Sequence, residues 1–111
     1  MTVRVLLADD SDIFRGAAAE VVAASPGFEL VGAASSGESA VALAAETRPD
    51  LVLLDVRMPG IGGIEAGRRI ADEHPKALVV LVTADGENLN GGFATIDKRS
   101  LSPARLGSLV S

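Results

Sequence analysis

Short apolar runs alternate along the chain with longer segments in which apolar residues recur every three or four positions. The first run, Val3–Ala8, is rich in valine and leucine and ends at two aspartates. A run of this length and composition predicts a strand buried inside a sheet. Similar runs predict four more strands, at Phe28–Ala34, Leu51–Leu54, Ala77–Val82 and around Phe93–Asp97.

Helices are predicted between these strands. The first begins at Ser11 or Asp12, because either side chain can cap the free backbone N–H groups of a first turn. Its apolar face has helical spacing and consists of Ile13, Phe14, Ala17, Ala18, Val21 and Val22. Further caps and breaks set the other helix boundaries: starts at Ser35 or Ser36 and at Ser102-Pro103, and stops at Pro26-Gly27, Pro49 and Pro75.

The alternation of strands and helices favours an α/β fold with a parallel sheet and right-handed crossovers. In open sheets of this kind, ligands bind at the carboxyl ends of the strands. The polar residues that end or follow the apolar runs all fall at that edge: Asp9, Asp10, Asp55, Thr83 and Lys98. We therefore expect one functional site there.

The composition agrees with this fold. A chain of 111 residues suits a single domain, which we expect to span residues 1–111. Hydrophobic residues make up 48% of the chain and aromatic residues only 3%, so the core is expected to be aliphatic. Such a core suits parallel strands that helices cover on both faces.

Charge and composition also exclude several classes of protein. The chain has no cysteine, which excludes disulfides and thiolate chemistry. A net charge of −5 argues against binding to nucleic acid, whose phosphates need a positive surface. The first residues turn acidic too early for a signal peptide, and no apolar run is long enough to span a membrane. We expect a cytoplasmic protein with no membrane contact.

The aspartates at the sheet edge point to metal-assisted phosphoryl chemistry. Three carboxylates within about 5 Å of one another repel by roughly 3 kcal/mol per pair at an effective dielectric near 20. Oxygen ligands of this kind suit Mg²⁺. Asp55 can accept a phosphoryl group, while Lys98 and Thr83 can contact its oxygens. Taken alone, each of these residues is more simply explained as part of a solvated turn or as a helix cap. Their combination at one edge of the sheet favours a functional site.

Three segments together resemble the receiver domain of bacterial two-component response regulators. They are VRVLLADDSDIFR near the start, PDLVLLDVRMPGIGGIEAGRRI in the middle and VVLVTA further on. The resemblance covers nearly the whole chain, and the middle segment is the most specific. It implies a flavodoxin-like, doubly wound sheet of five parallel strands in the order 2-1-3-4-5.

The resemblance also implies a metal site. By this match Asp55 accepts a phosphoryl group from the phosphohistidine of a histidine kinase. Asp10 would bind Mg²⁺ directly and Asp9 mainly through water, while Asp55 and the backbone carbonyl of Arg57 would complete the protein ligands.

On the phosphate side, the match implies that Thr83, Ala84 and Lys98 contact or surround the phosphoryl oxygens. Receivers commonly place Tyr or Phe three residues before this lysine as part of a conformational switch. Here Thr95 occupies that position, with Phe93 nearby as a substitute. The switch assignment therefore stays open between these two residues.

The chain departs from the family between Thr83 and Lys98. Only residues 84–97 intervene, and the fifth strand needs about five of them. The remainder is rich in glycine and asparagine, which oppose a helix. We predict that the fourth helix of the family is missing or reduced to one turn. Phosphorylation would then be coupled only weakly to shape, or would act by ordering the loop 85–92.

The leading hypothesis is a signalling receiver that acts through protein contacts. Its partners would be a histidine kinase and an unidentified downstream protein, and its oligomeric state is open, a homodimer included. It is not expected to be an enzyme, because transfer and hydrolysis would occur at its own Asp55. Two alternatives are the receiver portion of a longer DNA-binding transcriptional regulator and an interaction module that works without phosphorylation.

Overall fold

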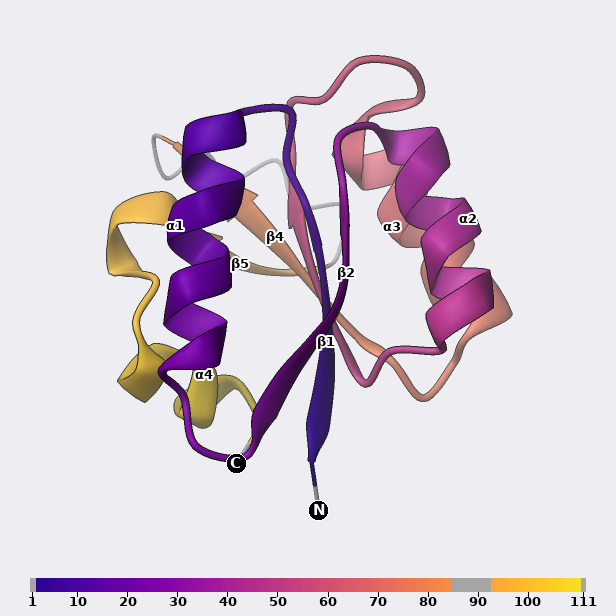
Figure 1. Ribbon diagram of the computed structural model, residues 1–111. Coiled ribbons are helices and arrows are strands. Elements are labelled where there is room, and N and C mark those ends of the chain that lie inside the picture. Colours follow the sequence, from indigo (N-terminus) through magenta and orange to yellow (C-terminus); the bar gives the residue numbers. More distant parts are fainter. Residues whose placement is uncertain (1, 85–92, 111) are drawn as a thin grey trace.

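The computed structural model describes residues 2–84 and 93–110. Its described residues form one parallel sheet in the order β2-β1-β3-β4-β5, as predicted. Figure 1 shows this sheet running through the centre of the molecule. The strands are β1 (Val3–Ala8), β2 (Phe28–Ala34), β3 (Leu51–Asp55), β4 (Leu78–Thr83) and β5 (Ala94–Asp97).

Three helices connect the strands from β1 to β4 as the sequence predicts, and two more follow β5. They are α1 (Asp12–Ala23), α2 (Gly37–Thr47), α3 (Gly62–Glu73), α4 (Pro103–Val110) and the short 3₁₀ helix η1 (Lys98–Ser100). Three strands differ from their predicted bounds: β3 also includes Asp55, β4 lies one residue later in the chain, and β5 starts at Ala94 instead of Phe93. The helix η1 had no sequence signal that we recognised.

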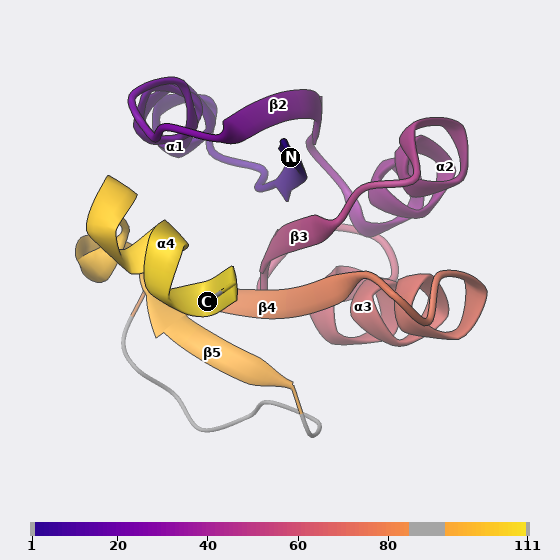
Figure 2. The same cartoon turned by 90° about the horizontal axis from the view of Figure 1, so that it is seen from below.

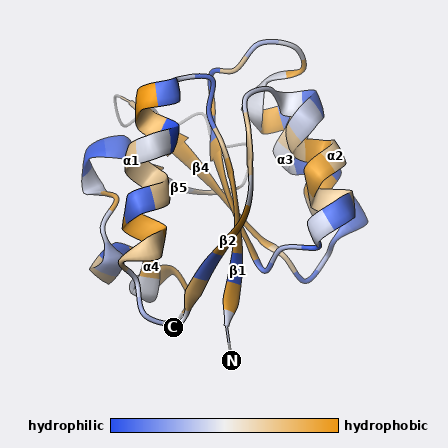
Figure 3. Cartoon of the chain, viewed as in Figure 1, coloured by the Kyte–Doolittle hydropathy of each residue, from blue (hydrophilic) through white to orange (hydrophobic). Residues whose placement is uncertain are grey.

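Helices cover both faces of the sheet. α1 and α4 lie on one face, and α2 and α3 lie on the other (Figure 2). Colouring by hydropathy shows long apolar stretches in the central strands, whereas the helices mix apolar and polar residues (Figure 3). Every residue of β3 is buried, which places this strand and its terminal Asp55 at the centre of the molecule.

Capping side chains fix where the helices begin. The Ser11 hydroxyl accepts a hydrogen bond from the Phe14 backbone N–H at 3.2 Å, at the start of α1. Ser36 and Ser39 form a reciprocal capping box at the start of α2. At the far end of that helix Arg48 is left-handed, with φ 48°, and this conformation stops the helix before Pro49.

The prediction of a missing or reduced fourth helix falls on residues 85–92, outside the described residues. Among the residues that the structure does describe, none of the helices has both the length and the apolar character needed to cross a bilayer.

Candidate functional site

The carboxyl ends of the strands bring the predicted polar residues together. Asp9 follows β1, Asp55 and Thr83 are the last residues of β3 and β4, and Lys98 comes directly after β5. Because all five strands run in the same direction, these positions meet at one edge of the sheet. A cavity of about 290 Å³ opens there, lined by Asp10, Asp55, Val56, Arg57, Thr83, Ala84 and Lys98.

Three aspartates form the acidic side of the site. Carboxylate oxygens of Asp9, Asp10 and Asp55 all lie within 4.8 Å of one another. Asp9 is completely buried and Asp55 is 6% exposed, whereas Asp10 is open to solvent. Hard oxygen donors at this spacing, with one side open, fit a Mg²⁺ ion that keeps several of its waters.

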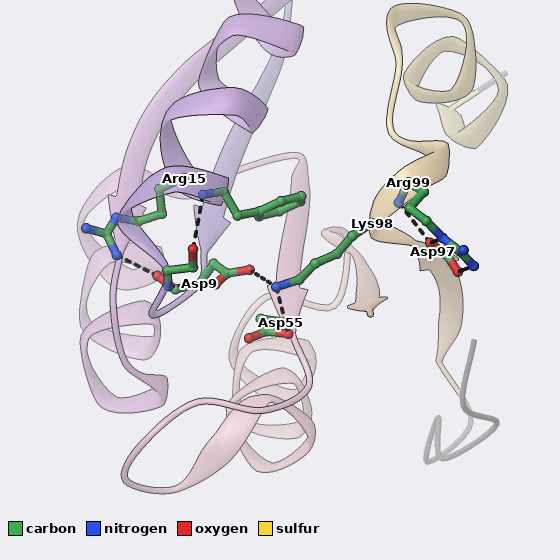
Figure 4. A network of polar contacts seen from close by, with 8 residues as sticks. Asp9, Arg15, Asp55, Asp97, Lys98 and Arg99 are labelled. Atoms are coloured by element: carbon green, nitrogen blue, oxygen red, sulfur yellow. Dashed lines mark hydrogen bonds and ion pairs between the residues drawn. The ribbon is translucent and has the colours of Figure 1, made fainter. Parts of the chain in front are cut away.

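Lys98 supplies the positive charge inside the site. Its Nζ lies 2.7 Å from Asp9 Oδ2 and 3.6 Å from Asp55 Oδ1, and Figure 4 shows it between the two carboxylates. Asp9 Oδ2 has no hydrogen-bond donor among the described residues, so its short contact with Lys98 is an ion pair without hydrogen-bond geometry. One ammonium therefore neutralises part of the charge of two buried carboxylates.

Burial and neighbouring charges shift the protonation of this pair. Burial raises the pKa of Asp55, the nearby charge of Asp9 raises it further, and Lys98 only partly opposes both. Burial alone would lower the pKa of Lys98, but the ion pairs with Asp9 and Asp55 outweigh it, so the pKa of Lys98 is raised. The protonated form is thus favoured at both groups relative to their ordinary pKa values, and positive charge added beside Asp55 would lower the pKa of Asp55 again.

The first turn of α1 holds Asp9 in place. The Ser11 backbone N–H donates to Asp9 Oδ1 at 2.8 Å, and Arg15 Nη1 donates to the Asp9 carbonyl oxygen at 2.7 Å. Arg15 also pairs with Asp12, three residues earlier on the same helix. The sequence analysis did not single out Arg15, although its spacing from Asp12 is the one that brings side chains together on a helix.

Close backbone packing fixes the loop that follows Asp55. A Cβ atom on Gly63 would lie 2.0 Å from the Asp55 carbonyl oxygen, so no side chain fits there. The Gly63 N–H donates to the carbonyl of Val56 at 3.1 Å. Gly60 and Gly62 have φ +80°, in the left-handed region that glycine tolerates best. The start of α3 is thus pressed against the backbone of Asp55.

The two switch candidates lie away from the cavity. Neither Phe93 nor Thr95 lines it. Phe93 instead packs on the α2–α3 side of the core, where its ring lies 3.5 Å from a Cβ built on Gly67. Six of the other predicted site residues line the cavity: Asp10, Asp55, Arg57, Thr83, Ala84 and Lys98. Asp9 does not line it but forms an ion pair with Lys98, which does.

Comparison with known proteins agrees with this architecture. Residues 5–95 match the family model described as the response regulator receiver domain. The chain belongs to this family. The chain is therefore a receiver domain of two-component signalling, a family whose members are in general phosphorylated on an aspartate.

Sequence relatives of this receiver domain are longer than the segment that they share with it. It is 45% identical over 86 residues to the response regulator GacA of Pseudomonas viridiflava, a match that covers 78% of this chain but 40% of GacA. It is 47% identical over 79 residues to a protein-glutamate methylesterase/protein-glutamine glutaminase of Anaeromyxobacter dehalogenans, covering 71% of this chain and 23% of that protein. The receiver domain thus spans less than half the length of these relatives.

Solved receiver structures share the whole fold. The receiver domain of NarL from Mycobacterium tuberculosis has a TM-score of 0.86 at 28% identity, covering 99% of this chain and 98% of that one. The corresponding domain of CheB from Thermotoga maritima has a TM-score of 0.85 at 27% identity, covering 99% and 95%.

Proposed function

We propose that Asp55 is the phosphoryl acceptor of this receiver and that a histidine kinase is the donor. The observation that carries this proposal is the cluster of three carboxylates and one ammonium beside a cavity of about 290 Å³, which Asp10, Asp55 and Lys98 line. Asp55 ends the central strand and reaches the cavity while 6% exposed, so its carboxylate is accessible from one direction. Asp9 is completely buried and does not line the cavity, so it is unsuited to in-line attack.

The transfer step is a displacement at phosphorus. An oxygen of the Asp55 carboxylate forms the new O–P bond as the N–P bond of the phosphohistidine breaks. The electron pair of the broken bond remains on the imidazole nitrogen, which then takes up a proton. Thr83 can donate its hydroxyl hydrogen to a phosphoryl oxygen, and Lys98 can shift from the carboxylates toward the added charge. The product remains on the chain, so the domain itself turns over no external substrate.

Asp9, Asp10 and Asp55 are the residues that would hold Mg²⁺, together with the backbone carbonyl of Arg57. The ion, when bound, supplies positive charge next to the acceptor and the transferred group. Lys98 alone leaves the three carboxylates with net negative charge, which would repel an incoming phosphate. The excess of acidic over basic groups in the site is the reason to propose a divalent cation there.

Phosphorylation of Asp55 can be tested by mass. With acetyl phosphate and Mg²⁺, the protein should become about 80 Da heavier. Asp55→Asn should abolish this change. Asp50→Asn, which alters an aspartate at the opposite edge of the sheet, should be labelled like the parent. Labelling of Asp55→Asn at the parental level would refute the assignment of the acceptor.

A second proposal concerns the context of the domain. The GacA match covers 40% of that protein. A LuxR-family response regulator from Aurantimonas is 31% identical to this chain with a TM-score of 0.84, and the match covers 97% of this chain and 81% of that one. These relatives support a role as the receiver portion of a longer regulator. Sequencing the gene past the codon for Ser111 tests this: a helix-turn-helix segment would support it, and an immediate stop codon would refute it.

A further inference from the structure

An aromatic ring lies against the ammonium of Lys98. The Nζ atom sits 4.6 Å from the centroid of the Phe14 ring, within the range of a cation–π contact. The same atom contacts Asp9 at 2.7 Å and Asp55 at 3.6 Å. Three groups therefore surround this ammonium, and only two of them carry charge.

Phe14 and Asp9 belong to one local unit. Ser11 connects them, because its backbone N–H donates to Asp9 Oδ1 and its hydroxyl accepts from the Phe14 N–H. Lys98 approaches this unit from η1, at the other end of the chain. The capped first turn of α1 thus presents a carboxylate and a ring face to the same ammonium.

Phe14 contacts Lys98 but does not line the cavity. The residues that line the cavity include Lys98 and Asp55 but not Phe14. The ring is half-buried and packs against the core cluster on the α1–α4 side of the sheet. Phe14 therefore touches neither the acceptor oxygen nor the space for a phosphoryl group, and any effect that it has on the reaction passes through Lys98.

A lysine side chain needs such support at this position. Its four-carbon stem is flexible, and the Lys98 side chain keeps 21% of its surface exposed, so rotation toward solvent is open to it. A ring face attracts a cation through its quadrupole, which an aliphatic side chain of similar size lacks. The ring therefore favours the inward position of the ammonium by more than simple packing would.

We propose that Phe14 is a positioning residue, whose ring holds the Lys98 ammonium beside Asp9 and Asp55 where a phosphoryl group on Asp55 would meet it. The inference rests on the proposed function of Asp55. It assigns to Phe14 a role beyond its place in the hydrophobic core.

Variants of Phe14 separate the two roles. Phe14→Leu keeps an apolar side chain and removes the ring, whereas Phe14→Tyr keeps the ring. Trifluorinated phenylalanine at this position keeps the shape and removes most of the negative charge from the ring face. Phe28→Leu is the matched control, because Phe28 packs on the same core cluster but at the opposite end of β2 from the site.

The main measurement is the affinity for beryllofluoride, a phosphoryl mimic, in the presence of Mg²⁺. Phe14→Leu and the trifluorinated protein should bind it roughly 2- to 30-fold more weakly, the range that a cation–π contact covers. Phe14→Tyr and Phe28→Leu should stay within about twofold of the parent. The affinity for Mg²⁺ alone should not fall in Phe14→Leu, since a looser ammonium competes less for the carboxylates. Equal affinities in the leucine and tyrosine variants, or no loss on fluorination, would overturn the proposal.

A second readout does not depend on phosphorylation. In the metal-free parent, the ring should shift the NMR signals of the Lys98 ε-protons upfield, and Phe14→Leu should abolish that shift. Absence of the shift in the parent overturns the contact itself. If the parent shows the shift but binds no beryllofluoride, the proposed function fails, and the positioning role fails with it. If the parent binds and only the Phe14 variants are indistinguishable, the function stands and the role of Phe14 is refuted.

Discussion

The two edges of the sheet both carry charged residues beside a cavity, but they arrange the charges differently. At the amino edge a cavity of about 370 Å³ is lined by Arg48, Pro49, Asp50, His74, Pro75, Lys76 and Ala77. The carboxylate of Asp50 accepts the Arg4 backbone N–H at 2.9 Å, and the Arg4 guanidinium donates to the carbonyls of Thr47 and Arg48. These contacts close the last turn of α2.

At the carboxyl edge the charges converge instead. Three carboxylates meet within 4.8 Å, and Lys98 is the ammonium that contacts two of them. The contrast shows that a cavity with charged walls is not by itself a functional site. At the amino edge the side chains of Arg4 and Asp50 bond to backbone groups, whereas the carboxyl edge brings three carboxylates together beside a space that can hold a ligand.

The largest difference between two matched substitutions is expected at glycines. Gly63→Ala should lower the free energy of unfolding by roughly 3 kcal/mol, because the new Cβ meets the Asp55 backbone, which has no room to move. Gly107→Ala in α4 meets open space and should stabilise the protein by about 0.5–1 kcal/mol through helix propensity. Urea denaturation of both variants measures this. Equal stabilities would show that the carboxyl edge is not tightly packed around Asp55.

The next prediction compares a lysine from each edge. Lys98→Met should lower the free energy of unfolding in metal-free buffer by about 2 kcal/mol, because it leaves the buried Asp9 carboxylate without a counter-charge. The value is below that of a fully buried pair, since Lys98 is partly exposed. Lys76→Met should change stability by less than about 0.5 kcal/mol, as Lys76 is exposed and has no ion pair with the described residues.

Much of the fold could be predicted from local patterns. The apolar run Leu51–Leu54 identified β3, and Ser36 and Pro49 bracketed α2, because strand burial and helix caps depend on neighbouring residues. The short strand β5 was harder to delimit. Of its residues Ala94–Asp97 only Ile96 is buried, so the strand lacks a long apolar run, and its pairing with β4 defines it more than its composition does.

The site was predictable only in part. A parallel sheet necessarily brings the ends of its strands to one edge, so the sequence pointed to Asp55, Thr83 and Lys98 together. The contact between Phe14 and Lys98 could not be foreseen, because Phe14 fits the apolar stripe of a helix and its ring meets a residue from the far end of the chain. Side-chain contacts over such distances leave no periodic signal in the sequence.

Mg²⁺ should stabilise the folded protein by binding at the carboxyl edge and not at the amino edge. At a concentration ten times its dissociation constant, Mg²⁺ should raise the free energy of unfolding by about 1.4 kcal/mol. Asp10→Asn should remove most of this gain, because it deletes the exposed carboxylate of the cluster. Asp50→Asn should retain it, whatever its own stability. Thermal unfolding with and without Mg²⁺ tests this. If Mg²⁺ still stabilised Asp10→Asn but no longer stabilised Asp50→Asn, the cation would bind at the amino edge and the proposed site would be refuted.

The smallest effect is expected at Asp97, which lies at the carboxyl edge but bonds locally. Its carboxylate accepts the Arg99 backbone N–H at 2.8 Å and pairs with the Arg99 guanidinium, which lowers the pKa of Asp97 to about 2 (Figure 4). Because folding lowers this pKa from 3.8, the stabilisation is present above pH 3.8 and is lost as the pH falls toward 2.

Asp97→Asn keeps an oxygen that can cap η1 but loses the ion pair with Arg99. Its melting temperature should therefore lie slightly below that of the parent at pH 5, and the two should converge as the pH approaches 2. Added salt should shrink the difference at pH 5, because the Arg99 side chain is exposed and the Asp97 carboxylate is partly exposed, so ions can screen the pair. Phosphorylation of Asp55 should be unaffected, since Asp97 does not line the cavity. A large loss of labelling in Asp97→Asn would contradict this, because it would mean that the Asp97–Arg99 pair influences the reaction at Asp55.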